Sequence, residues 1–226
     1  QYIWDVLKVH IPPDEGSLSH KERFVRTFVE ADDRHKKLIA ISLWCLWPVI
    51  GSAVKESWRP PEFGFIKINF DASFIQDKGL ATTAVLARNY KEDVVGAKTY
   101  LFKEVADSFV AEAQACERAL VFAHKMGFQQ LAVEGDALSF IKNIRRNEAG
   151  KSIIRPIIYN IHQLDRNFEE VKYSFVSREV NKAAHVLAIE GRRRGVCWNW
   201  VNDVPDLVRI VVRKDRLGWD QRSQGC

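Results

Sequence analysis

Alternating apolar and polar residues at positions 65–73 predict the first strand of a sheet. Ile66, Ile68 and Phe70 are separated by polar residues, a period of two that is typical of a half-buried strand. The polar face carries one carboxylate, Asp71, just before the chain is expected to turn. We therefore expect this strand to present an acidic side chain at its end.

Two further strand patterns follow after short polar turns. Residues 80–88 are rich in Thr, Ala and Val, and residues 94–102 form the next strand candidate. The segments 76–79 and 89–93 have turn composition. Because short turns join antiparallel neighbours, the first three strands are expected to form a meander.

Helical spacing then alternates with two short strands. A helix is expected to begin at Asp107 or Ser108 and to end at Gly127, a suitable residue after a helix C-terminus. The remaining expected elements are a strand at 130–135, a helix with Leu138, Ile141 and Ile144 inward, a helix at 153–168, a strand at 171–176 and a helix at 181–194. The order βββαβααβα predicts an α/β fold with a mixed five-stranded sheet flanked by helices.

A break at residues 58–64, with paired prolines and a glycine, separates this pattern from an N-terminal helical extension. In that extension, apolar residues at helical spacing predict a helix from about Ser19 to Trp47, with Ser19 and Glu22 as a capping box. The C-terminal tail, which contains Trp198, Trp200 and the apolar run Val208–Val212, is expected to cover a sheet edge or a helix face. The expected division of the chain is 1–57, 58–195 and 196–226.

Composition narrows the class of protein. No run reaches the roughly 18 apolar residues that a membrane span needs, because the longest candidate, 38–53, is interrupted by Pro48. The four cysteines are far apart and form no Cys-x-x-Cys pair, so neither a zinc site nor a disulfide framework is expected. We expect an intracellular protein, in the nucleus or cytoplasm, with no membrane partner.

The chain is mildly basic, with a net charge of +5. Such an excess is compatible with a polyanionic partner but does not establish one, and the oligomeric state stays open. Because the chain begins at Gln1 and its only methionine is Met126, we expect the natural N-terminus to lie upstream.

Three acidic residues fall near the ends of predicted elements. Asp71 ends the first strand, Glu112 lies near the first turn of the first predicted helix, and Asp136 follows the strand at 130–135. Converging carboxylates suit a hard divalent cation such as Mg²⁺. Each also has an ordinary explanation: Asp71 as a turn residue, Glu112 as a solvent-facing residue and Asp136 as a helix N-cap.

The order of elements and of acidic positions resembles the ribonuclease H domain. More narrowly, it resembles the plant ribonuclease H-like domain at the C-terminal end of non-LTR retroelement reverse transcriptases and in stand-alone relatives. The matching segments, in the family's order, are Trp58-x-Pro60-Pro61-x-x-Gly64-x-x-Lys67-x-Asn69-x-Asp71, Ala111-Glu112-x-x-Ala115, Val133-Glu134-x-Asp136 and Arg178-Glu179-x-Asn181-x-Ala183-Ala184-His185-x-Leu187-Ala188. In this resemblance, residues 1–57 correspond to the linker from an upstream reverse transcriptase body.

The resemblance implies hydrolysis of the RNA strand of RNA–DNA hybrids with two Mg²⁺ ions, or Mn²⁺ in their place. Two cations about 3.5–4 Å apart would hold the scissile phosphate, activate a water and stabilise the leaving 3′ oxygen. In that scheme Asp71 bridges both ions, while Glu112 and Asp136 bind one ion and help to orient water. Ser73 and Asn181 are the implied substrate contacts, where the 2′-hydroxyl distinguishes RNA from DNA.

One position departs from the wider superfamily, which has an aspartate where this chain has His185, as the plant branch often does. A neutral imidazole could ligate a metal or relay a proton, or His185 could simply be packed. Ala72 and the turn 90–92 also replace positions where the family often has glycine. An alternative function therefore stays open: a catalytically weak or inactive nucleic-acid-binding module of retroelement origin. A protein-interaction domain that uses the Trp-rich flanks is a third.

Two further charged features also keep two explanations each. Glu134 shares a strand face with Asp136, so it is either a neighbour of the cation site or a surface residue. Residues 192–194 are three arginines at the end of the last predicted helix. We favour a solvated helix end that complements the helix dipole over a phosphate contact.

Overall fold

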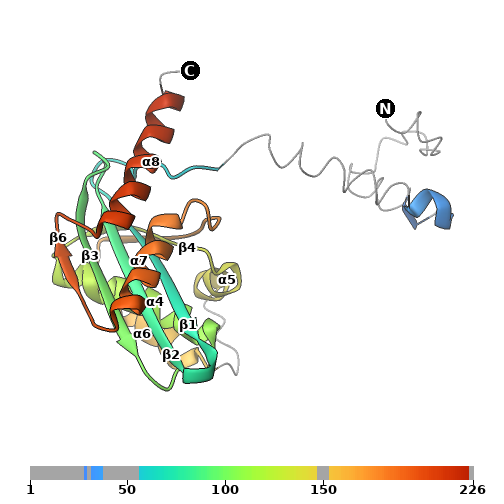
Figure 1. Cartoon of the computed structure of the whole chain (residues 1–226), viewed down its shortest axis with the longest axis horizontal. Helices are drawn as coiled ribbons and strands as arrows, with labels where there is room; N and C mark the ends of the chain where they lie inside the picture. Colours follow the sequence, from blue (N-terminus) through green and yellow to red (C-terminus); the bar gives the residue numbers. More distant parts are fainter. Residues whose placement is uncertain (1–27, 30–31, 38–55, 147–152, 224–226) are drawn as a thin grey trace. The chain divides into compact units, whose positions relative to one another are not determined.

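The structure is a computed structural model that describes residues 28–29, 32–37, 56–146 and 153–223 (Figure 1). The chain divides into two units, Gln1–Lys55 and Glu56–Cys226. In the first unit, residues 28–29 and 33–37 are helical and fall inside the helix expected from Ser19 to Trp47. The expected capping box lies outside the described residues.

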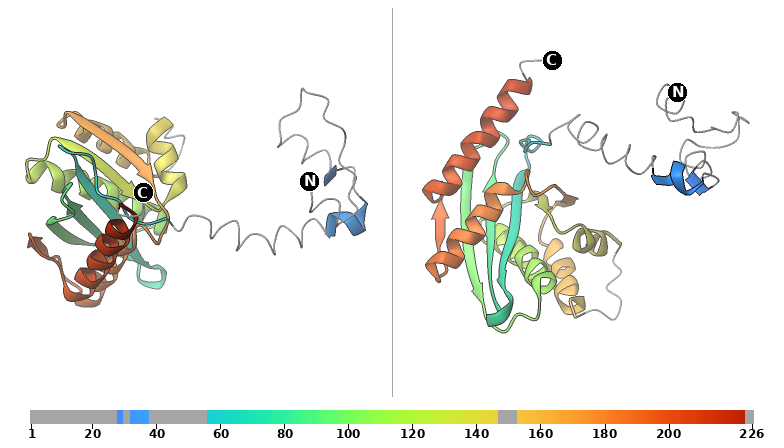
Figure 2. Two further views of the ribbon diagram at one scale, coloured as in Figure 1. Left: turned by 90° about the horizontal axis from the view of Figure 1, so that it is seen from above. Right: turned by 45° about the vertical axis from the view of Figure 1, so that its right-hand side comes forward.

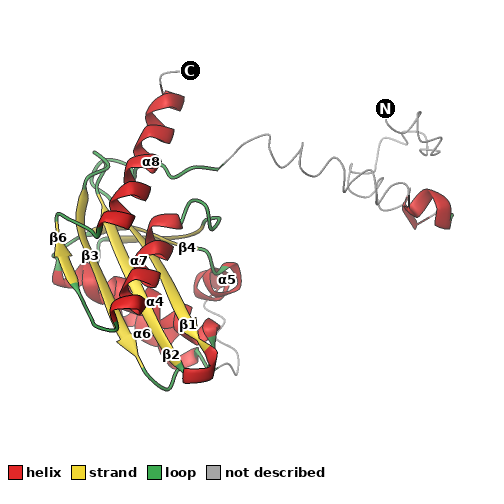
Figure 3. Cartoon of the chain, viewed as in Figure 1, coloured by secondary structure: helices red, strands yellow, loops and turns green. Residues whose placement is uncertain are grey.

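In the described part of the second unit, six strands form one mixed sheet in the order β5-β4-β1-β2-β3-β6 (Figure 3). β1 pairs antiparallel with β2 and parallel with β4, and β2 pairs antiparallel with β3, which confirms the meander. The strands are β1 (Ile66–Ile75), β2 (Leu80–Arg88), β3 (Val94–Phe102), β4 (Gln130–Gly135), β5 (Glu170–Phe175) and β6 (Asn199–Val201).

The expected count of five strands was therefore wrong by one. β6 lies in the expected tail and pairs antiparallel with β3 through Trp200 and its two neighbours. Three residues are too short to show a period of two, so sequence pattern alone does not reveal such a strand. As expected for this tail, one part of it covers a sheet edge.

Helices cover both faces of the sheet. The helices are α4 (Ser108–Lys125), α5 (Leu138–Arg146), α6 (Arg155–Asp165), α7 (Lys182–Arg194) and α8 (Asp206–Ser223), with one 3-10 turn, η1 (Gln76–Lys78). α4, α5 and α6 lie on one face, and α7 and α8 on the other (Figure 2). α8 begins just before the apolar run noted in the tail and buries Val208 against α7 and the sheet.

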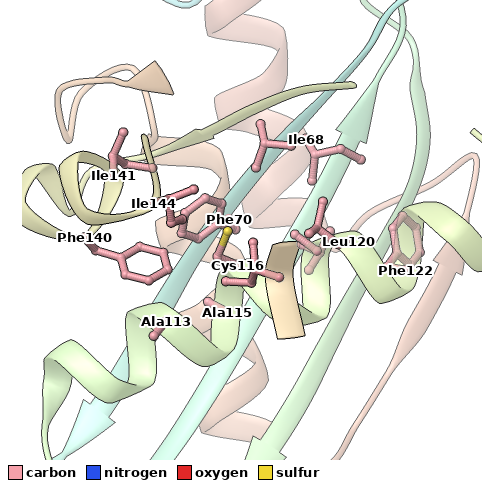
Figure 4. Packing of buried hydrophobic residues seen from close by; sticks show 14 of the residues in the cluster. Ile68, Phe70, Ala113, Ala115, Cys116, Leu120, Phe122, Phe140, Ile141 and Ile144 are labelled. Atoms are coloured by element: carbon pink, nitrogen blue, oxygen red, sulfur yellow. The ribbon is translucent and has the colours of Figure 1, made fainter. Parts of the chain in front are cut away.

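The larger core lies between the sheet and α4 to α6, where Ile68 and Phe70 meet residues of α4 and α5 (Figure 4). The Phe70 and Phe140 rings are 6.4 Å apart, edge to face. A side chain on Gly135 would overlap the Phe70 ring, so only glycine fits at the end of β4. This close packing holds the middle of β1 and the end of β4 at a constant separation.

Two local expectations for β1 were wrong. The strand does not end at Asp71 but continues to Ile75, with the turn at η1. Its polar face is not solvated either: Trp58 and Arg88 contact Asn69, His185 of α7 contacts Asp71, and Asn69 and Asp71 are both 0% exposed. Alternating polarity indicates two chemically different faces, and here both are buried.

None of the described helices combines the length and the apolar character that crossing a membrane requires.

Candidate metal centre

Three carboxylates from different elements meet on the α7 side of the sheet. Asp71 lies in β1, Glu112 follows the first turn of α4, and Asp136 follows β4. Each offers an oxygen, and the three oxygens lie within 4.8 Å of one another. The expected convergence is therefore present, although the residues are up to 65 positions apart in sequence.

Strand register explains why Asp71 and Asp136 are neighbours. β1 and β4 run parallel, and Asn69 lies opposite Glu134. Two residues further along each strand direction, the side chains point to the same face again, which brings Asp71 and Asp136 together. The ordinary explanation of Asp71 as a turn residue is excluded, because it lies inside a strand.

α4 brings Glu112 to the cluster from the other direction. Asp107 caps the helix, its carboxylate accepting a hydrogen bond from the Val110 backbone N–H at 2.8 Å. Ala111, Ala113 and other small residues of α4 are fully buried, which lets the helix approach the sheet closely. Glu112 is thereby held beside the sheet and is not a solvent-facing residue.

Burial makes this cluster unfavourable without a counter-charge. Desolvation raises the pKa of Asp71, helped by the charge of Asp136 and opposed by the hydrogen bond to His185. Desolvation, followed by the charges of Asp71 and Asp136, raises the pKa of Glu112 well above its ordinary value. Closely spaced, desolvated carboxylates resist simultaneous ionisation.

Two oxygens of the cluster also lack partners. Asp71 Oδ1 and Glu112 Oε2 are buried without a hydrogen-bond partner among the described residues. Buried polar atoms are rarely left unpaired, and binding of an ion is one explanation for an exception. The donor set, hard oxygens only, fits Mg²⁺ or Mn²⁺.

His185 joins the cluster from α7. Its Nδ1 lies 2.7 Å from Asp71 Oδ2, and its side chain is 21% exposed. The imidazole is thus placed at the expected fourth position, bound to a carboxylate of the protein. Its roles as metal ligand or proton relay stay predictions.

Asn181 and Ser73, the predicted substrate contacts, lie beside the cluster but are buried. Asn181 is 0% exposed, and its Nδ2 donates to the Phe70 carbonyl at 2.8 Å and to Asp136 Oδ1 at 3.4 Å. It therefore ties the beginning of α7 to β1. Ser73 is 7% exposed on the Asp71 face of β1. Substrate contact by either stays a prediction.

Arg178 is a site residue whose individual role sequence reasoning missed. It lies between β5 and α7, and its Nε is 2.5 Å from Asp136 Oδ2. Its Nη1 is 3.3 Å from His185 Nδ1, so one side chain contacts two members of the site. The available signal was its place in the segment with Asn181, which the resemblance treated only as a marker.

A second buried polar group lies on the same sheet face, nearer the beginning of β1. Trp58 Nε1 donates to Asn69 Oδ1 at 3.2 Å, and Arg88 Nη2 donates to the same oxygen at 3.0 Å. Asn69 Nδ2 in turn donates to Glu134 Oε2 at 3.0 Å. Lys67 Nζ completes the group at 2.6 Å from Glu134 Oε1. We call these five residues the Trp58 network.

The Trp58 network resolves the two explanations of Glu134. Its carboxylate is held by Lys67 and Asn69, so it is neither a surface residue nor one of the three clustered carboxylates. The network also reaches α8, because Arg88 Nη1 is 2.7 Å from Asp215 Oδ2. The Arg88 guanidinium lies 3.7 Å from the centre of the Trp58 ring.

The arginines at the end of α7 pair with their own helix, and their contact with phosphate stays untested. Arg193 and Arg194 lie 3.5 and 3.7 Å from Glu190 of the same helix and remain largely exposed. Gly195 follows with φ of 66°, the left-handed conformation of a helix C-cap. In the turn 90–92, Glu92 also adopts a positive φ, 66°, in the left-handed region that favours glycine.

Comparison with known proteins agrees with this geometry. The chain matches the reverse transcriptase-like family over residues 69–191. Among solved structures, it is similar to ribonuclease H1 of the archaeon Halobacterium salinarum NRC-1, with TM-score 0.54, 20% identity, and coverage of 57% of this chain and 98% of that one. A search of curated proteins gave no match.

Two other solved structures show similar agreement. The N-terminal RNase H domain of a Mycobacterium tuberculosis protein has TM-score 0.53 and 20% identity, covering 57% of this chain and 94% of that one. LC11-RNase H1, solved in complex with an RNA/DNA hybrid, has TM-score 0.53 and 18% identity, covering 57% and 98%. At such identities the likeness concerns the fold. With a family match over more than half its length, the chain belongs to the reverse transcriptase-like family, and its second unit has the ribonuclease H fold.

Proposed function

We propose that this chain is a divalent-cation-dependent endonuclease that cleaves the RNA strand of RNA–DNA hybrids. The observation that carries the proposal is the meeting of three buried or half-buried carboxylates, two of whose oxygens have no partner in the described structure. Family membership and similarity to solved ribonucleases H1 support it. One of those relatives was solved with an RNA/DNA hybrid.

Asp71, Glu112 and Asp136 are the proposed ligands of two Mg²⁺ or Mn²⁺ ions. When bound, such ions stabilise charge on the scissile phosphate and lower the pKa of an attacking water. Asp71 is positioned for the central role, because it is fully buried between the other two elements and is held by His185 through one oxygen. Asn181 fixes the beginning of α7 relative to β1 and Asp136, through its hydrogen bonds to the Phe70 carbonyl and to Asp136.

A nucleic-acid-binding module without useful turnover is the second candidate. One observation favours it: His185 and Arg178 engage oxygens of Asp71 and Asp136 within the protein itself. Imidazole is also a poorer match to Mg²⁺ than carboxylate. Plant and retroelement origin, and location in the nucleus or cytoplasm, remain proposals that rest on the sequence resemblance.

The test incubates a labelled RNA–DNA hybrid with the protein and either Mg²⁺ or Mn²⁺. We expect cleavage of the RNA strand, lost at least about a thousandfold in Asp71→Asn. Asp206→Asn is the matched control, because it removes an 88% exposed carboxylate on α8. Tight hybrid binding without cleavage under either metal would instead establish the binding module.

A further inference from the structure

The oxygens of the carboxylate cluster differ in what already holds them. Asp71 Oδ1 and Glu112 Oε2 have no hydrogen-bond partner in the described part of the chain. Both oxygens of Asp136 are engaged, Oδ2 by Arg178 at 2.5 Å and Oδ1 by Asn181 at 3.4 Å. Asp71 and Glu112 therefore each offer a free oxygen to a cation, whereas Asp136 offers oxygens that are already engaged by Arg178 and Asn181.

Arg178 is suited to act as a replaceable partner. Its side chain is 55% exposed, while the Asp136 side chain is 6% exposed, so the guanidinium approaches the carboxylate from the solvent side. Partial burial opposes its charge, yet Asp136, Asp71 and Glu112 together raise the pKa of Arg178. The guanidinium therefore balances negative charge from the whole cluster.

We infer that Arg178 is a built-in competitor for the divalent cation that binds through Asp136, and that it must release Asp136 Oδ2 before that cation binds fully. This inference rests on the proposed function, because it concerns the same cation site. It implies unequal affinities: a cation held without Asp136 binds first, and the cation that needs Asp136 binds more weakly.

The size of the effect follows from the exposure of Arg178. A largely exposed ion pair contributes up to about 1 kcal/mol, which corresponds to about fivefold in a dissociation constant. Removing the guanidinium should therefore tighten the weaker cation site by about that factor. Arg178→Lys keeps a positive charge that competes with the cation, so it should leave the cation affinity close to that of the unaltered chain.

The test measures Mn²⁺ binding by isothermal titration calorimetry and by the electron paramagnetic resonance signal of free Mn²⁺. The proteins are the full chain and its Arg178→Gln, Arg178→Lys and Arg193→Gln variants. Arg193→Gln is the matched control, because it removes the same charge from a 75% exposed side chain at the far end of α7. A second readout is thermal unfolding in chelator, where Arg178→Gln should lower the midpoint and Mn²⁺ should restore it.

The expected result is that Arg178→Gln lowers the weaker dissociation constant about fivefold, while the other two variants stay within about twofold. An unchanged or weaker affinity in Arg178→Gln overturns the inference and leaves the proposed function standing. If the unaltered chain binds no Mn²⁺ and so behaves like Asp71→Asn, the proposed function itself is overturned. The two failures are therefore distinguishable.

Discussion

Two buried polar clusters lie on the same face of the sheet, and they are built differently. The Trp58 network contains Asn69, and the candidate metal centre contains Asp71, two residues along the same strand; both residues are 0% exposed. In the network, negative and positive groups alternate: Lys67 contacts Glu134, and Arg88 contacts Asp215. In the metal centre, three carboxylates meet. Among the described residues, Arg178 is the permanently charged cation that pairs with one of them, Asp136.

The difference separates a cluster that stabilises the fold from a cluster that needs a bound counter-charge. Buried charges are tolerated when they are paired and hydrogen-bonded, which the Trp58 network largely achieves. The metal centre leaves two carboxylate oxygens unpaired and raises the pKa of both Asp71 and Glu112 by burial. Unfavourable arrangements of this kind tend to be retained at functional sites.

Breaking the network should have the largest effect on stability. Trp58 is 1% exposed and its ring lies against Arg88, so Trp58→Ala should lower the free energy of unfolding by about 3–5 kcal/mol. Urea unfolding measures this. Trp198→Ala, at a 45% exposed tryptophan, is the control and should cost less than about 1 kcal/mol. Equal losses in both variants would remove the distinction between the buried and the exposed tryptophan.

Matched removal of one carboxylate from each cluster sharpens the comparison. Glu134→Gln leaves the buried Lys67 ammonium without its anionic partner and should cost about 2–4 kcal/mol. Asp136→Asn should change stability in chelator by less than about 1 kcal/mol, because Arg178 is exposed and repulsion within the cluster falls. Chemical unfolding of both variants with chelator present tests this. A larger loss in Asp136→Asn would contradict it.

Cation binding should stabilise only through the metal centre. At a free Mg²⁺ concentration about a hundredfold above its dissociation constant, the unaltered chain should gain about 2.7 kcal/mol. Asp71→Asn should lose that gain, whereas Glu134→Gln should keep it, because Glu134 lies in the Trp58 network. Thermal unfolding across a Mg²⁺ titration is the measurement, and an equal gain in Asp71→Asn would contradict a site at Asp71.

The smallest expected effect is a dependence on pH in the metal-free protein. The pKa of Glu112 is raised above its ordinary 4.5, mainly by burial, so folding favours the neutral form. Its contribution to stability is complete below that ordinary value and is lost as pH rises through the raised pKa. Glu112→Gln should flatten this decline and stabilise the chain by about 1–2 kcal/mol near neutral pH. Unfolding in chelator across pH tests it; identical profiles would refute the assignment.

Much of the fold could be predicted because its signals are local. The expected bounds of β2 and β3 agree with the structure, and α4 begins where a helix was expected, at Ser108 with Asp107 as its cap. Periodicity and capping depend on neighbours within a few residues, which a single sequence displays directly. β6 was not predicted, because three residues are too few to show the period of a strand. The place of α8 could not be predicted either, because it depends on packing against α7 and the sheet.

In the candidate site, too, some features could be predicted from the sequence and others could not. The sequence by itself determined the order of the carboxylates along the chain, and its pattern and family resemblance singled out Asp71, Glu112 and Asp136, although Asp71 lies inside β1 and not at its end. Only the tertiary structure decided that Glu134 belongs to the Trp58 network, that Arg178 holds Asp136, and that the polar face of β1 is buried. The physical reason is distance along the chain. Arg88 and Asp215 are 127 residues apart and His185 and Asp71 are 114 apart, so strand register and helix packing alone bring these partners together.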